Sequence, residues 1–237
     1  MLVAAAVCPH PPILVPEVAA GAASETATLR AACLDAVRRL QACRPDLLVV
    51  VGDADRTGPR AGGEGGSFAG FGVPVGVTLG DGPTEGDRTA QLPLSLCVGA
   101  WLLRAAETAG VHRGYGIASS TTSTEAAAVG VSLARQADRV ALLVMGDGSA
   151  RRTDKAPGAL HPRAADFDGA VAEALATADC ERLLDLDPGY AVELLAAGRA
   201  AWQVLAGAGW GVLWQAELTF DAAPYGVGYF VATWQRG

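Results

Sequence analysis

Polar side chains follow several apolar, strand-like stretches of this sequence, and their types are those that hold metal ions or transfer protons. His10 lies in CPHPPILVPE, directly after the apolar opening MLVAAAV. Asp53 and Asp55 follow LLVVVG, and Asp147 and Ser149 follow ALLVMG. Neutral imidazole together with carboxylate oxygen is a ligand set suited to non-haem Fe(II), Mn or Zn. The residue types therefore favour a metal centre or an acid/base site.

The same residues also have structural interpretations. The prolines on both sides of His10 fix the backbone, so its ring could simply hydrogen-bond a neighbouring loop. Aspartate directly after a strand often caps a turn or a helix, which applies to Asp53 and Asp147. His161, in the loop after ALLVMG, could reach over the same crevice, whereas His112 is expected on the surface. These alternatives stay open on spacing alone.

The elements that must position these residues alternate between strand and helix. Short apolar runs predict strands at 2–7, 47–52, 73–79, 114–118, 141–146, 212–220 and 227–234. Helical spacing predicts helices through 29–40, 93–108, 124–136 (capped by Thr124), 165–178 and 188–206. The glycine-rich segment 53–72 is expected to form neither helix nor strand.

The order of these elements predicts the fold class. We expect one α/β domain over residues 1–237, with a central mixed, largely parallel β-sheet flanked by helices. In open sheets of this class, sites lie in the crevice beyond the carboxyl ends of the parallel strands. The polar residues after the apolar runs should therefore meet at one edge.

The amino-acid composition limits the classes of molecule that the protein is expected to bind. A net charge of −7 and a pI near 4.9 argue against binding nucleic acid or an anionic membrane surface, so a small molecule or a protein is the expected partner. No apolar run is long enough to span a membrane, and the N-terminus does not read as a signal peptide, so a cytoplasmic location is expected. A homo-oligomer is left open, because the tryptophans near the C-terminus, which are Trp202, Trp210, Trp214 and Trp234, could form core or interface.

Several short motifs together resemble a known superfamily. They are CPHPPILVPE after the first strand, LLVVVGDAD, LLVMGDGSARR with the later ADFDGAV, and the ending PYGVGYFVATW. The chain resembles the class III extradiol ring-cleavage dioxygenases, which include the LigB catalytic subunit and the Memo-like proteins. The motifs span nearly the whole chain, although each is short.

The resemblance implies a metal site. Active members hold Fe(II) by two histidines and a carboxylate, which leaves positions open for a catecholate and O2. His10 matches the first ligand histidine. Where the second histidine is expected the chain has GDAD, so either Asp53 or Asp55 takes that role or the metal site is damaged. Glu217, on the strand entering the last turn, is the candidate carboxylate ligand.

The resemblance also implies an acid/base histidine, but Ala150 of GDGSA stands at its position. His161 is the nearest histidine that could take this role, beside Asp147 and Ser149. The chain thus keeps one ligand histidine and lacks two histidines that the family's chemistry uses.

These observations leave three hypotheses for function. The first is a divergent Fe(II)-dependent oxygenase that acts on a small aromatic or phenolic compound. The second is a metal-free, catalytically inactive scaffold that binds a small ligand or a protein partner in the former active-site crevice. The third and weakest is a metal-dependent hydrolase, in which bound water is the nucleophile, built from His10, Asp53, Asp55, Asp147 and His161.

Overall fold

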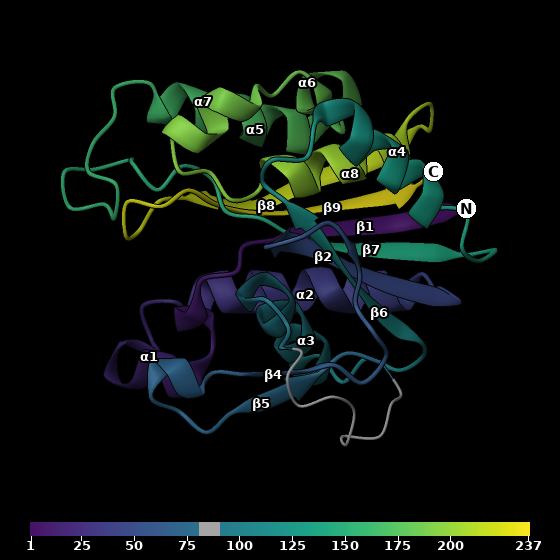
Figure 1. Ribbon diagram of the computed structural model, residues 1–237, viewed down its shortest axis with the longest axis horizontal. Helices are drawn as coiled ribbons and strands as arrows, with labels where there is room; N and C mark the ends of the chain where they lie inside the picture. Colours follow the sequence, from purple (N-terminus) through teal and green to yellow (C-terminus); the bar gives the residue numbers. More distant parts are fainter. Residues whose placement is uncertain (81–90) are drawn as a thin grey trace.

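A mixed seven-stranded β-sheet forms the centre of the computed structural model, which describes residues 1–80 and 91–237 (Figure 1). In spatial order its strands are β3 (Gly58–Pro59), β6 (His112–Ala118), β2 (Leu47–Ala54), β7 (Val140–Met145), β1 (Leu2–Cys8), β9 (Tyr229–Arg236) and β8 (Trp214–Ala222). β6, β2, β7 and β1 are parallel, and the outer strands are antiparallel to their neighbours. The predicted fold class is confirmed.

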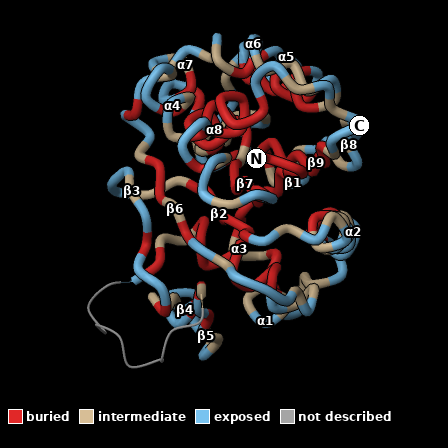
Figure 2. The backbone as a smooth tube through the Cα atoms, turned by 90° about the vertical axis from the view of Figure 1, so that its right-hand side faces the viewer, coloured by how far each residue is buried: buried red, intermediate tan, exposed pale blue. Residues whose placement is uncertain are grey.

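The parallel strands form because their sequences are uninterrupted apolar runs. Every residue of β1 and β7 is buried, as Figure 2 shows for the centre of the molecule. Strands buried on both faces need apolar side chains on both faces, which LVAAAVC and VALLVM supply. Met145 of β7 pairs with Cys8 of β1 and with Gly52 of β2, so the carboxyl ends of these strands lie level.

Helices cover both faces of the sheet (Figure 1). The helices are α1 (Pro16–Ala19), α2 (Ala27–Ala42), α3 (Leu94–Ala105), α4 (Ser123–Leu133), α5 (Ala164–Thr177), α6 (Cys180–Leu184), α7 (Pro188–Glu193) and α8 (Arg199–Gly209). α2 and α3 pack on one face together with a separate hairpin, β4 (Gly65–Ser67) and β5 (Gly76–Thr78). α4 to α8 pack on the other face. Within the described ranges, none of these helices has the length and apolar character that a membrane crossing requires.

Close contact between α4 and α8 fixes the second layer. A Cβ at Gly130 would come within 2.0 Å of the carbonyl oxygen of Val204, and one at Gly207 within 2.2 Å of that of Ala127. The glycines therefore let the two backbones touch, as larger residues could not. α8 also carries Trp202, which is fully buried against Phe230 of β9. This packing places the first turn of α8 beside the carboxyl ends of the parallel strands.

Some predicted elements differ from the observed ones. The glycine-rich segment 53–72 does contain short strands, β3 and β4, because backbone pairing with β6 and β5 does not need apolar side chains. Thr122, not Thr124, caps α4: it accepts the Glu125 N–H while the Glu125 carboxylate accepts the Thr122 N–H. The single helix predicted at 188–206 is two helices, α7 and α8, and α6 was not predicted.

The tryptophans divide between core and surface. Trp202 and Trp234 are buried, and the ring of Trp214 packs at a tilt beside that of Trp234. Trp210 is 57% exposed at the end of α8. Of these four tryptophans, only Trp210 is largely exposed and could contact a second copy of the chain. A homo-oligomer therefore stays a prediction.

Candidate functional site

His10 sits at the carboxyl end of β1, where the chain leaves the sheet. Its backbone N–H donates to the Asp147 Oδ1 at 2.7 Å, and its ring Nδ1 lies 3.5 Å from the same oxygen without hydrogen-bond alignment. His10 is only 7% exposed. The carboxyl of Asp147 thus holds the backbone of His10, and the imidazole ring lies beside this carboxyl without a hydrogen bond to it.

Asp147 and Asp53 complete this group because their strands flank each other. β7 lies between β1 and β2 in the sheet, so Asp147 at the end of β7 has His10 on one side and Asp53 of β2 on the other. Burial raises the pKa of the Asp147 carboxyl, and the nearby His10 partly opposes this rise. Burial also raises the pKa of Asp53, which His10 lowers and Asp147 raises. The three groups therefore influence one another electrostatically, as the argument from strand ends predicted.

Among residues 1–80 and 91–237, two buried nitrogen atoms near this edge have no hydrogen-bond partner. One is Nδ1 of His10 and the other is Nε1 of Trp202. The indole nitrogen lies close to the end of β7, since a Cβ at Gly146 would come 2.8 Å from it. An unpaired buried polar group costs about 1 to 3 kcal/mol, so such groups point to a bound molecule or to a functional use.

Arg199, in the first turn of α8, forms a wall next to Asp53. It is 2% exposed, and its guanidinium donates to the carbonyl oxygens of Thr121 (2.7 Å) and Ser119 and to Gln203 Oε1 (2.7 Å). Asp53 and Arg199 both line a small cavity of about 10 Å³, which is enough for about one water molecule. The helices α7 and α8 and their connection cover the rest of this cavity.

The other proposed metal ligands lie elsewhere. The Asp55 side chain is 78% exposed and binds Arg60 Nη2 at 3.1 Å, which lowers the pKa of its carboxyl. Glu217 is exposed on β8 and pairs with Arg39 of α2. Its strand is separated from β1 by β9. The structure therefore does not bring Asp55 or Glu217 to His10, because each carboxylate forms an ion pair with a different arginine, Arg60 or Arg39.

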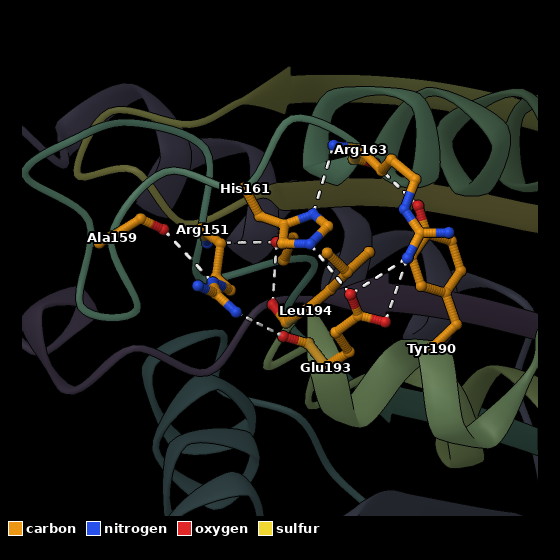
Figure 3. Close-up of polar contacts among 8 residues, drawn as sticks. Arg151, Ala159, His161, Arg163, Tyr190, Glu193 and Leu194 are labelled. Atoms are coloured by element: carbon orange, nitrogen blue, oxygen red, sulfur yellow. Dashed lines mark hydrogen bonds and ion pairs between the residues drawn. The ribbon is translucent and has the colours of Figure 1, made fainter.

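His161 is held by a separate group of residues (Figure 3). Its Nδ1 accepts the backbone N–H of Arg163 at 3.3 Å, and its Nε2 lies 3.0 Å from Glu193 Oε1. The guanidinium of Arg163 binds the same carboxylate at 3.1 Å and stacks on Tyr190. Both ring nitrogens of His161 thus have partners of their own, and the structure does not place it over the group around His10.

Ser149 is fully buried in the turn after β7. Its hydroxyl donates to the carbonyl oxygen of Leu194 at 2.9 Å and accepts the Arg151 N–H at 3.1 Å. Its own N–H donates to Asp168 Oδ1 at 2.8 Å. These contacts give Ser149 a role in holding the loop, because its hydroxyl both donates and accepts within it.

Asp168 is a buried carboxylate that the sequence argument did not single out. It is 1% exposed in α5 and receives Arg152 Nη1 at 2.8 Å as well as the Ser149 N–H. Cβ atoms at Gly148 or Gly228 would come within 2.7 Å or 2.1 Å of its oxygens, so both backbones approach it closely. Its position four residues after the buried Ala164 was the available signal, since that spacing puts Asp168 on the inner face of the helix.

The residues present do not fit the Fe(II) site that the resemblance implies. Across residues 1–80 and 91–237, no group of three or more His, Cys, Asp or Glu side chains is arranged to hold a metal ion. His10, Asp53 and Asp147 are neighbours, yet their donor atoms do not converge on one point. Asp55, Glu217 and His161, which would complete the set, are each engaged elsewhere.

Comparisons with known proteins bear on the fold alone. No family model and no curated protein matches the chain. Among solved structures, the chain matches the crystal structure of the uncharacterized protein JW3007 from Escherichia coli K12 with a TM-score of 0.55 and 13% sequence identity. The match covers 98% of this chain and 99% of that chain. The two proteins share an architecture over their full lengths.

Proposed function

We propose that this protein binds a small hydroxyl-bearing ligand at the carboxyl edge of its sheet, through His10, Asp53 and Asp147 and without a metal ion. The observation that carries the proposal is the buried Nδ1 of His10, which lies beside two largely buried carboxyl groups and has no hydrogen-bond partner in the described part of the chain. Native proteins rarely leave such an atom unpaired, so a ligand that pairs with it gains free energy.

The chemistry of these groups favours a hydroxyl. Either tautomer of His10 leaves Nδ1 in need of a partner: a donor if the nitrogen is bare and an acceptor if it carries the proton. A hydroxyl group can serve as both, and it can also donate to a carboxyl oxygen of Asp147 or Asp53. A small phenolic or catecholic compound meets these requirements and is the ligand class that we propose.

Room for such a ligand must come from the cover over Asp53. The cavity there is about 10 Å³, far below the volume of a phenol. Its cover includes Val192 at the end of α7, which is 61% exposed, and Ala196 and Ala197 in the connection to α8. Leu194, at the start of this connection, is fully buried and its carbonyl oxygen accepts the Ser149 hydroxyl, so the part free to move is the small-residue stretch 196–198. We propose that ligand binding displaces this segment.

An iron-dependent oxygenase is the second candidate. What favours it is that His10, Asp53 and Asp147 follow adjacent strands, where the resemblance places the metal site. What weighs against it is the dispersal of Asp55, Glu217 and His161. The same separation of Asp55 and His161 from His10 also argues against the metal-dependent hydrolase. Membership of the extradiol superfamily and a cytoplasmic location remain predictions.

Calorimetric titration with catechol distinguishes these functions. Protein stripped with a chelator is expected to bind catechol with a single saturable site, and Asp53→Asn is expected to weaken binding about tenfold. Asp55→Asn is the matched control, because that carboxylate faces solvent, and it should leave binding unchanged. Binding that appears only after Fe(II) is added, together with catechol-dependent O2 uptake, would instead establish the oxygenase.

A further inference from the structure

A second pocket lies at the opposite end of the sheet from His10. It has a volume of about 440 Å³, within the range of small-molecule sites, and is formed by α3, the β4–β5 hairpin and the start of β6. His112 lines it and pairs with Leu48 of β2, whereas Asp53 pairs with Ile117 further along β6. This difference in register separates the two levels by roughly 17 Å, so the pocket is distinct from the His10 site.

The floor of the pocket is apolar. Val77 of β5 and Ala100 and Leu103 of α3 line it, and each is 3 to 5% exposed in the folded chain. Gly66 and Gly76 of the hairpin also line it and bring no side chains that could fill the space. The pocket therefore offers an apolar surface to a hydrocarbon or aromatic group.

The rim of the pocket is polar and carries a fixed cation. Arg104 lines it, and its Nη1 donates to the carbonyl oxygen of Gly76 at 2.7 Å, which holds the guanidinium against the hairpin. Within the described part of the chain, Arg104 forms no ion pair and its Nε and Nη2 donate to no acceptor. This pair of nitrogens is the edge that binds a carboxylate with two parallel hydrogen bonds. The hydroxyl-bearing Thr78 and Thr108 lie on the same rim.

We propose that this pocket binds a small monocarboxylate with an apolar body, whose carboxylate pairs with Arg104 and whose body rests on Val77, Ala100 and Leu103. The combination of an apolar floor with one restrained, unpaired guanidinium at the rim is what a ligand of this class requires. What distinguishes Arg104 is its place, since the Gly76 carbonyl holds its guanidinium at the rim of an apolar pocket.

Octanoate and its neutral counterpart 1-octanol are suitable probes, observed by ¹H–¹⁵N NMR on the full chain. Octanoate is expected to bind saturably, with shifts centred on the amides of Gly66, Gly76, Thr78 and Thr108, and 1-octanol about tenfold more weakly. Equal affinity for both probes, or shifts of octanoate elsewhere, would overturn the proposal.

Variants of Arg104 test the role of the charge. Arg104→Gln removes the charge but keeps a polar side chain and should weaken octanoate binding about tenfold or more, whereas Arg104→Lys should stay within about threefold of the wild type. Arg113→Gln is the matched control, because this exposed residue follows His112 on the opposite side of β6. Unchanged binding in Arg104→Gln, or equal loss in Arg113→Gln, would refute the assignment. If Arg104→Gln does not fold, the affinities of Arg104→Lys for octanoate and 1-octanol are compared instead. The proposal requires that Arg104→Lys still prefer octanoate, and equal affinity for the two probes would refute it.

Discussion

The charge of Asp147 is expected to cost stability, and Asp147→Asn tests this directly. The Oδ1 of Asp147 accepts the His10 N–H at 2.7 Å, and an asparagine side-chain oxygen can accept the same hydrogen bond. The substitution therefore removes the charge while it keeps the contact. Burial is the main cause of the raised pKa of Asp147, and the attraction of His10 only partly offsets it. Relief of the buried charge should therefore exceed the loss of attraction to His10.

The sign of the pH dependence follows from the raised pKa. A carboxyl whose pKa is higher in the folded than in the unfolded state binds its proton more tightly when folded, so stability is lost as the pH rises from about 3.9 through the folded pKa. Each unit of pKa difference corresponds to about 1.4 kcal/mol of unfolding free energy. Asp147→Asn should thus match the wild type near pH 3 and exceed it at pH 7, with a plateau above the folded pKa.

Urea unfolding at several pH values measures this difference, with Asp55→Asn as control. The pKa of Asp55 is lowered by Arg60 and its side chain is 78% exposed, so Asp55→Asn should change stability little and in the opposite direction, with any loss confined to higher pH. A variant Asp147→Asn that is less stable than the wild type at pH 7, or a difference that does not vary with pH, would refute the reasoning.

Further predictions concern the elements that position the site, and each is measured by urea unfolding. Gly130→Ala should destabilise the protein by at least about 2 kcal/mol, because its Cβ would lie 2.0 Å from the Val204 oxygen. Gly169→Ala in α5 is the control: its Cβ meets nothing within 4 Å, so it should stabilise the protein by about 0.5 to 1 kcal/mol. Similar effects at both positions would contradict the close α4–α8 contact. Asp168→Ala should cost about 3 kcal/mol by leaving Arg152 and the Ser149 N–H without their acceptor, while Asp166→Ala on the exposed side of α5 should cost well under 1 kcal/mol. Arg199→Met should cost about 3 kcal/mol, because the carbonyls of Ser119 and Thr121 lose their donor; a neutral effect would show that water replaces it.

The strands, and the meeting of His10, Asp53 and Asp147 at one edge of the sheet, could be predicted from the sequence. Long apolar runs define buried strands, and the geometry of parallel sheets brings their carboxyl ends together whatever the loops do. The same logic placed Asp53 near His10, which is why its pKa responds to His10. These inferences rest on local pattern and on a rule of topology, and neither depends on details of loop conformation.

The rest of the site depends on contacts between distant segments. Asp55 is two residues from Asp53, yet it turns to solvent because Arg60 in the following loop provides a partner. His161 is fixed by Glu193, which lies in a helix more than one element away along the chain. Glu217 faces Arg39 across the α2–β8 contact. No spacing in the sequence specifies these ion pairs, because each is set by how separate elements pack.

A crystal structure of chelator-treated protein with catechol would test the central claim most directly. The account predicts a catechol hydroxyl within hydrogen-bond distance of His10 Nδ1 and of a carboxyl oxygen of Asp147 or Asp53, with the connection between α7 and α8 displaced and no metal ion at the site. Catechol bound away from His10, or bound only together with a metal ion held by His10, would contradict it.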